Sequence, residues 1–162
     1  MAKRKTAQQP HPDPASISVE DCPYYLVSRA TLAVTSALKE RFTRGGIVNV
    51  RPAYLGVLMS LWQQDGIKVN ELGQRAGLEP STMTGLIDRM ERDGLVERTA
   101  HQDDRRAQKI HLTSQGRGVR QAVLAIIEET LADVLRSIPK KEMAVTKGVL
   151  RRIIGNAHEV VS

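Results

Sequence analysis

Residues 69–116 read VNELGQRAGLEPSTMTGLIDRMERDGLVERTAHQDDRRAQKIHLTSQG, with helical spacing in the first half and alternating polarity in the second. A short helix is predicted over 69–76, because Leu72 and Ala76 are four residues apart and Asn70 is placed to cap it. Gly77 begins a turn, and Pro80 suits the first position of a second helix. Two short helices joined by a glycine-bearing turn predict a helix-turn-helix.

The second of these helices has two different faces. Apolar side chains recur at i, i+3, i+4 and i+7 and form one stripe: Met83, Leu86, Ile87 and Met90. The residues off this stripe are small or polar: Ser81, Thr82, Thr84, Gly85, Asp88 and Arg89. A short polar face of this kind fits the major groove of DNA, and Ser81, Thr82, Thr84 and Arg89 are predicted to contact bases and phosphates. Simple capping of the helix N-terminus is an alternative role for the hydroxyls, and both roles can coexist.

A β-hairpin is predicted directly after this helix. Residues 95–99 and 109–113 alternate in polarity and are rich in β-branched side chains, and the charged segment AHQDDRRAQ lies between them. This is the position at which a wing follows a helix-turn-helix.

The segments on either side predict long helices. Apolar residues keep helical spacing over 19–44, over about 52–64, over 114–138 with Ser114 as the cap, and from after Pro139 to near the C-terminus. Their apolar faces exceed what one small domain can bury, which favours a helical dimer interface. The predicted fold is mainly α with a small β wing: a winged helix-turn-helix with a helical dimerisation region. The expected parts are a disordered basic tail (1–16), a first dimerisation helix (17–50), the winged domain (51–113) and the C-terminal dimerisation helices (114–162).

Composition narrows the function classes. The 162 residues carry a net charge of +6, which favours a polyanionic partner. No apolar run is long enough to cross a bilayer, so a cytoplasmic protein without membrane contact is expected. One cysteine and four scattered histidines predict no metal site and no cofactor. Neither a nucleophile paired with a base nor a glycine-rich phosphate loop is visible, so the sequence does not predict an enzyme.

The stretch from Val69 to Gly116 resembles the multiple-antibiotic-resistance regulator (MarR) family. The matching motifs are Leu72 with Ala76, Pro80-Ser81-Thr82 with Thr84, Asp88-Arg89-Met90-Glu91, Gly94-Leu95-Val96, Asp104-Arg105-Arg106, and Leu112-Thr113 leading to Gly116. The resemblance implies a homodimeric transcriptional repressor whose two winged domains straddle a near-palindromic operator in double-stranded DNA.

The resemblance also assigns roles within the hairpin. Arg106 matches a wing-tip arginine that enters the minor groove, Asp104 matches the carboxylate that holds it, and Arg105 is expected beside them. A solvated surface salt bridge is the alternative reading of these three residues. Two positions depart from the family pattern: Glu79 is a poor cap for the recognition helix, and Gly85 replaces a larger, often basic residue.

Regulation by a small phenolic or carboxylate ligand is a further expectation from the resemblance. Residues that suit such a pocket are Tyr24, Tyr25 and Arg29 in the first helix, with Tyr54 and Trp62 in the second. Ordinary core or interface packing explains these aromatic residues equally well. Cys22 offers a different mechanism, since one subgroup of the family senses oxidants through a cysteine near the start of the first helix. A DNA-binding protein without any effector is the third alternative.

Overall fold

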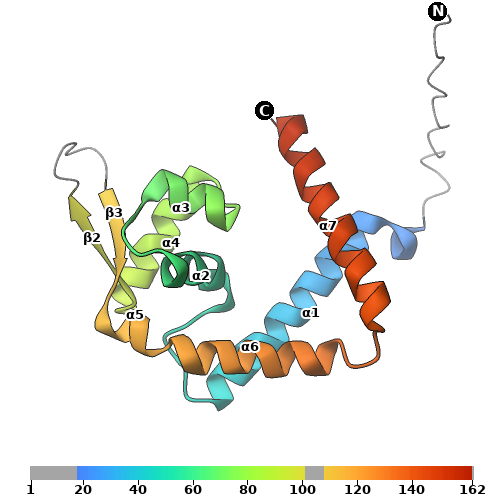
Figure 1. The fold of residues 1–162 in the computed structure, drawn as a ribbon, viewed down its shortest axis with the longest axis horizontal. Coiled ribbons are helices and arrows are strands. Elements are labelled where there is room, and N and C mark those ends of the chain that lie inside the picture. Colours follow the sequence, from blue (N-terminus) through green and yellow to red (C-terminus); the bar gives the residue numbers. More distant parts are fainter. Residues whose placement is uncertain (1–17, 101–107, 162) are drawn as a thin grey trace, which may run out of the picture.

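The computed structural model describes residues 18–100 and 108–161, which form a compact lobe and a helical arm (Figure 1). The lobe contains η3 (Pro52–Tyr54), α2 (Leu55–Gln63), β1 (Ile67–Lys68), α3 (Val69–Ala76), α4 (Pro80–Arg92), β2 (Val96–Ala100), β3 (Gln108–Leu112) and α5 (Ser114–Gly118). The arm contains η2 (Val19–Asp21), α1 (Pro23–Arg44), α6 (Arg120–Val134) and α7 (Lys140–Val161). The predicted fold class, mainly helical with a small β wing, is confirmed.

The helix-turn-helix forms as predicted, with one correction at its start. α3 ends at Gly77, whose φ of 66° is left-handed, and the amide of Leu78 donates to the carbonyl of Gly73 at 2.9 Å. Pro80 is the first residue of α4, and Glu79 makes no side-chain cap. The prediction that Asn70 caps α3 is wrong: Lys68 is the N-cap residue and Asn70 lies inside the helix. The helix starts this early because β1 runs directly into it.

Three short antiparallel strands make the sheet, in the order β1-β3-β2. In the hairpin, Val96 pairs with Leu112 and Ala100 with Gln108, within one residue of the predicted strands. β1 adds the pairs Ile67 with Ile110 and Lys68 with Lys109. The sequence did not predict β1, because two residues are too few to show a period of two.

The single helix predicted over 114–138 is two helices. Val119 separates α5 from α6, with φ of −75° and ψ of −11°, and α6 already ends at Val134. Ser114 is not the cap. Thr113 is, because its hydroxyl accepts from the amide of Gly116 at 3.0 Å and donates to the carbonyl of Gly94 at 2.6 Å. These bonds attach α5 to the lobe, while α6 runs outward into the arm.

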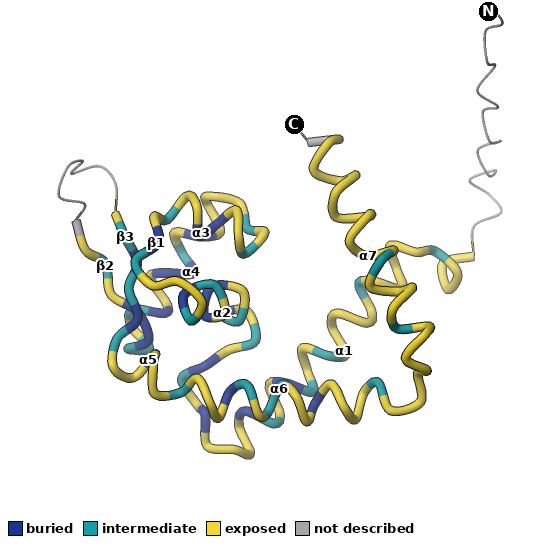
Figure 2. The backbone as a smooth tube through the Cα atoms, viewed as in Figure 1, coloured by how far each residue is buried: buried dark blue, intermediate teal, exposed yellow. Residues whose placement is uncertain are grey.

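Burial differs sharply between lobe and arm (Figure 2). The core is drawn mainly from α2, α4 and the sheet, whereas the 22 residues of α1 contribute only Leu38 and Phe42 to it. No residue of α7 from 140 to 160 is buried. Large apolar side chains are therefore left exposed on the arm: Tyr24, Tyr25, Leu26, Val27 and Leu32 on α1, Leu131 and Val134 on α6, and Val145, Val149, Leu150, Ile153, Ile154 and Val160 on α7.

Candidate nucleic-acid interface

The two faces of α4 are separated as the sequence predicts. The apolar stripe of Met83, Leu86, Ile87 and Met90 is buried, with at most 3 % of any side chain exposed. Ser81, Thr82, Thr84 and Arg89 are all exposed. The structure therefore brings four predicted contact residues together on one solvent-facing side of a helix that the core holds rigidly from behind.

The start of α4 presents a partial positive charge to solvent. The first amides of a helix have no partner within the helix, and Glu79 supplies no side-chain cap for them. Thr84 donates its hydroxyl to the carbonyl of Pro80 at 3.2 Å, which leaves the hydroxyl oxygen able to accept. Arg89 lies along Gly85, with its Nη1 atom 3.5 Å from where a β-carbon on that glycine would stand. This face can therefore receive both base edges and phosphate oxygens.

Arg98 joins the hairpin to α4. Its Nη2 atom donates to Asp88 at 2.6 Å, its Nη1 atom pairs with Glu91, and its backbone amide donates to the other oxygen of Glu91 at 3.1 Å. One guanidinium between two carboxylates thus helps to fix the orientation of β2 relative to α4. Arg98 was not predicted from the sequence; its position in the strand alternation, on the side of the buried Ile110, was the available signal.

Asp65 makes a second junction, at the root of the hairpin. Its Oδ1 atom accepts from the amide of Gly66 at 3.0 Å and from the amide of Leu112 at 2.9 Å, and its Oδ2 atom accepts from Arg117 at 3.0 Å. One carboxylate therefore ties the turn before β1 to β3 and to α5. In the sequence, Asp65 is recognisable only as a turn residue.

The predicted wing-tip residues Asp104, Arg105 and Arg106 lie outside the described residues. The described part of the hairpin ends at Ala100 and resumes at Gln108, and these two residues are paired with each other. The strands are therefore in register up to both ends of the predicted tip.

The five residues predicted to bind an effector are not brought together. Tyr54 is fully buried in the lobe, and the indole of Trp62 donates to the carbonyl of Gly116 at 3.0 Å, so both have structural partners. Tyr24, Tyr25 and Arg29 are exposed near the start of α1. Figure 1 shows this end of α1 at the far end of the arm from α2.

An open pocket of about 820 Å³ lies elsewhere, between the helix-turn-helix and the C-terminal end of α7. Its lining includes Val69, Asn70, Leu78, Met83 and His158, and none of the five predicted effector residues. The pocket is therefore lined both by the helix-turn-helix, which is predicted to bind DNA, and by the arm.

Cys22 is the N-cap residue of α1 and is partly exposed. Over residues 18–100 and 108–161, no group of three or more His, Cys, Asp and Glu side chains is arranged to hold a metal ion. Within the same ranges, no helix combines the length and apolar character needed to span a bilayer.

The phenol of Tyr54 ties the start of α2 to the end of α4. Its hydroxyl donates to Oδ2 of Asp93 at 2.7 Å, and Nε of Arg51 lies 3.5 Å from the same oxygen. Burial, followed by the hydrogen bond to Asp93 and the charge of that carboxylate, raises the pKa of Tyr54 above its ordinary value of 10.0. The neutral phenol is thus the form that the folded lobe stabilises.

Tyr54→Phe is expected to lower the free energy of unfolding by about 1–2 kcal/mol, because Asp93 loses a donor. The unfolded chain releases the phenol proton at lower pH than the folded chain, so this residue's stabilising contribution is complete below pH 10.0 and is lost as pH rises through the folded pKa. Denaturant melts from pH 8 to pH 11 should show an alkaline loss of stability that is smaller in the Phe variant. Equal losses in both proteins would contradict this assignment.

Comparison with known proteins supports the same fold. The model of the MarR family matches residues 52–107, which span the lobe from η3 to the end of the predicted hairpin tip. The HTH-type transcriptional regulator YsmB of Bacillus subtilis is 34% identical over 102 residues, covering 63% of this chain and 69% of that protein. TtmR of Methylorubrum extorquens, also an HTH-type transcriptional regulator, is 42% identical over 69 residues. That match covers 43% of this chain but only 35% of the regulator's own length.

Among solved structures, CouR of Rhodococcus jostii bound to p-coumaroyl-CoA has a TM-score of 0.71 and 26% identity. The alignment covers 86% of this chain and 96% of that one, so it includes arm as well as lobe. The sequence motifs, the winged lobe and these similarities agree, and the chain belongs to the MarR family.

Proposed function

We propose that this protein is a homodimeric transcriptional regulator that binds double-stranded DNA through α4 and the β2–β3 hairpin and acts as a repressor. The polar face of α4 carries this proposal, since Ser81, Thr82, Thr84 and Arg89 are exposed over a fully buried apolar stripe. A rigid helix with small polar side chains on its outer face can enter the major groove and reach base edges. The hairpin beside it supplies the wing, in which Arg106 would reach the minor groove and Asp104 would hold it, with Arg105 beside them.

The unburied apolar surface of the arm supports the dimer. α7 is 22 residues long, and Val145, Ile153 and Ile154 are between 46% and 61% exposed. A helix of this kind is only marginally stable without a packing partner. A second copy that covers α1, α6 and α7 would bury these side chains and present two α4 helices related by a two-fold axis, which suits a near-palindromic operator.

The direct test is DNase footprinting of the DNA next to the protein's own coding region, with light scattering to measure the mass in solution. A protected, near-palindromic segment and a mass of two chains are expected. A monomer that protects no segment of that DNA, and that binds no other double-stranded DNA, would contradict the proposal.

Arg106→Ala is expected to weaken operator binding at least about tenfold, because one minor-groove contact is lost in each half-site. The fold and the dimer should be unchanged, since Arg106 belongs to the charged segment AHQDDRRAQ, which the sequence predicts to be the hairpin tip and not part of the core. Arg136→Ala, in the exposed connection between α6 and α7, removes the same charge and is the matched control. Anisotropy titrations with labelled operator give both affinities, and equal values for the two variants would refute the wing assignment.

We further propose that a small phenolic or carboxylate ligand releases the DNA. Such a ligand shifts the population only if it binds the DNA-incompetent arrangement more tightly than the competent one. The pocket between the helix-turn-helix and α7 supports this idea, because a ligand bound there would contact the helix-turn-helix and the arm together. CouR, a similar structure, is bound to p-coumaroyl-CoA. A thermal shift with 4-hydroxybenzoate or p-coumaroyl-CoA, together with loss of operator binding, is expected; if neither changes, the protein acts without these effectors.

Oxidant sensing by Cys22 is the alternative mode of control. Its position as the partly exposed N-cap residue of α1 favours this reading, because an oxidant in solution can reach the thiol. Cumene hydroperoxide should then release the operator from the wild-type protein and not from Cys22→Ser. Release from both proteins, or from neither, would exclude this mechanism.

A further inference from the structure

Two lysines face each other across the outer surface of the sheet. Lys68 of β1 is paired in register with Lys109 of β3, and Thr99 of β2 is the partner of Lys109 on its other side. Side chains of directly opposite residues lie on the same side of a sheet, about 5 Å apart at their β-carbons. Ile67 and Ile110 are buried on the inner side, so Lys68, Lys109 and Thr99 share the outer side.

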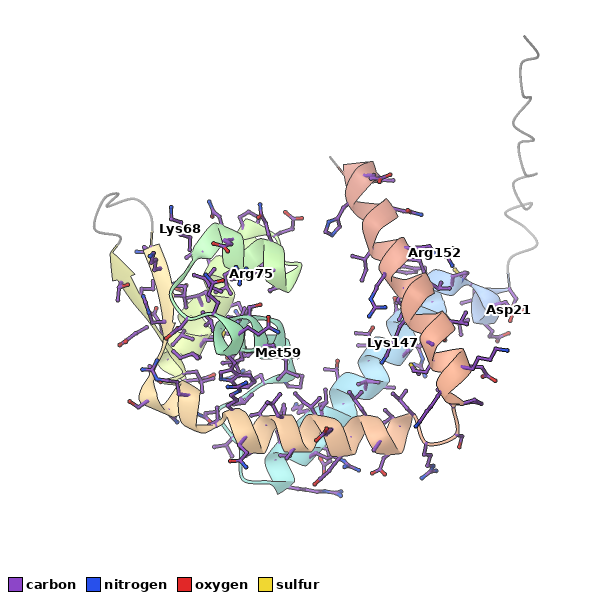
Figure 3. All side chains as sticks on the ribbon, viewed as in Figure 1. Asp21, Met59, Lys68, Arg75, Lys147 and Arg152 are labelled. Atoms are coloured by element: carbon purple, nitrogen blue, oxygen red, sulfur yellow. The ribbon has the colours of Figure 1, made fainter. Side chains whose placement is uncertain are left out.

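Within residues 18–100 and 108–161, neither lysine has an anionic partner. The nearby Arg75 of α3 differs, because it is paired with Glu71 at 2.5 Å and with Gln64 at 2.7 Å. Figure 3 shows Lys68 at the edge of the lobe where β1 meets α3, while Arg75 lies further along that helix. Like charges directly opposite on a sheet are destabilising, so this pair has a cost that the described structure does not offset.

On the outer side of the sheet, positive and negative side chains lie at different ends of the strands. The lysine pair lies toward the hairpin tip, since Lys109 is the second residue of β3. The carboxylates lie nearer the root, where Glu97 pairs in register with His111 and Asp65 is bonded to Leu112. The end of the sheet nearest the proposed DNA is thus the positive end.

We propose that Lys68, Lys109 and the hydroxyl of Thr99 form a clamp for one phosphate of the DNA backbone. A phosphate between the two ammonium groups would turn their mutual repulsion into two charge-assisted contacts, and the threonine hydroxyl can donate to one of the same two non-bridging oxygens. The contact would hold the sheet against the DNA strand that borders the groove entered by the wing. This inference rests on the proposed DNA binding, and it adds a sequence-independent site outside α4 and the wing tip.

The test compares Lys68→Gln and Lys109→Gln with Lys140→Gln, which removes an equal charge at the exposed start of α7. Binding of a labelled mixed-sequence duplex of about 30 base pairs is measured by anisotropy over a range of salt concentrations. Each sheet variant should bind about fivefold more weakly at low salt and reduce the salt slope by about one per lysine per protomer. Lys140→Gln should change the slope much less, and Lys68→Arg should retain most of the affinity.

Thermal melts separate the clamp from a merely structural role. Removing either lysine relieves repulsion, so the melting temperature should stay level or rise while DNA affinity falls. A marked fall in melting temperature in the sheet variants, or salt slopes equal to that of Lys140→Gln, would overturn the clamp and leave the proposed function standing. A wild-type protein that does not bind the duplex even at low salt would overturn both.

Discussion

Gly116→Ala is expected to destabilise the protein by about 3 kcal/mol, which is roughly a 10 °C fall in melting temperature for a chain of this size. A β-carbon at this position would stand 2.0 Å from the carbonyl oxygen of Leu95 and 3.2 Å from Cδ2 of Leu112. The first of these atoms is backbone and cannot rotate away. The same glycine also accepts from the indole of Trp62 and donates to Thr113, so any shift that relieves the overlap breaks these bonds.

Gly118→Ala, two residues later in α5, is the matched control and should have the opposite sign. Apart from its chain neighbours and its own helix backbone, no atom of the described residues lies within 4 Å of a β-carbon placed on Gly118. Alanine therefore gains only its better helix propensity, about 0.5–1 kcal/mol. Urea denaturation followed by circular dichroism measures both variants, and a fully stable Gly116→Ala protein would show that α5 does not pack on the lobe as described.

The double variant Leu150→Glu/Ile154→Glu is expected to abolish the dimer and to weaken operator binding by about 100-fold or more. These side chains are four residues apart on α7 and are 38% and 58% exposed in the single chain, so charges there leave the lobe core untouched. In the proposed dimer they would place four unpaired carboxylates in an apolar interface. The operator affinity falls because each lobe then binds its half-site alone.

Arg151→Glu is the control for this pair, since it changes the net charge by the same amount. At 100° per residue, Arg151 lies outside the arc of α7 that contains Val149, Ile153 and Ile154. The Arg151→Glu variant should have the mass of a dimer in light scattering. The double variant should have the mass of a monomer and remain folded. Persistence of the dimer in the double variant would show that this face of α7 is not the interface.

The helix-turn-helix and its polar face could be predicted because both depend on neighbours within a few residues. Gly77 and Pro80 marked the turn before α4 and its first residue. The buried side of α4 followed from the helical spacing of its apolar residues, which are Met83, Leu86, Ile87 and Met90. Caps were predicted less well. Asn70 and Ser114 are reasonable capping residues, but a neighbouring strand and the hydroxyl of Thr113 determined where those helices begin.

The ion pairs and hydrogen bonds that hold the hairpin against α4 and α5 could not be predicted in this way. In the sequence, Arg98 is an ordinary strand residue, and only the packing of α4 against β2 places Asp88 and Glu91 beside it. Asp65 is likewise an ordinary turn residue, and its bonds to Leu112 and Arg117 form only in the folded chain. The Lys68–Lys109 pair depends on β1, a strand too short to leave a pattern. Each of these interactions requires strand register, which local periodicity does not encode.

By itself the sequence determined the winged helix-turn-helix and the polar side of α4, because periodicity and turn residues act over a few positions along the chain. Tertiary structure alone decided that Tyr54 and Trp62 form hydrogen bonds within the lobe, since their partners Asp93 and Gly116 are 39 and 54 residues away. It also decided which apolar faces stay uncovered. α1 and α7 carry apolar residues at helical spacing, as α4 does, yet only packing shows that the core covers the apolar face of α4 and leaves most of theirs exposed.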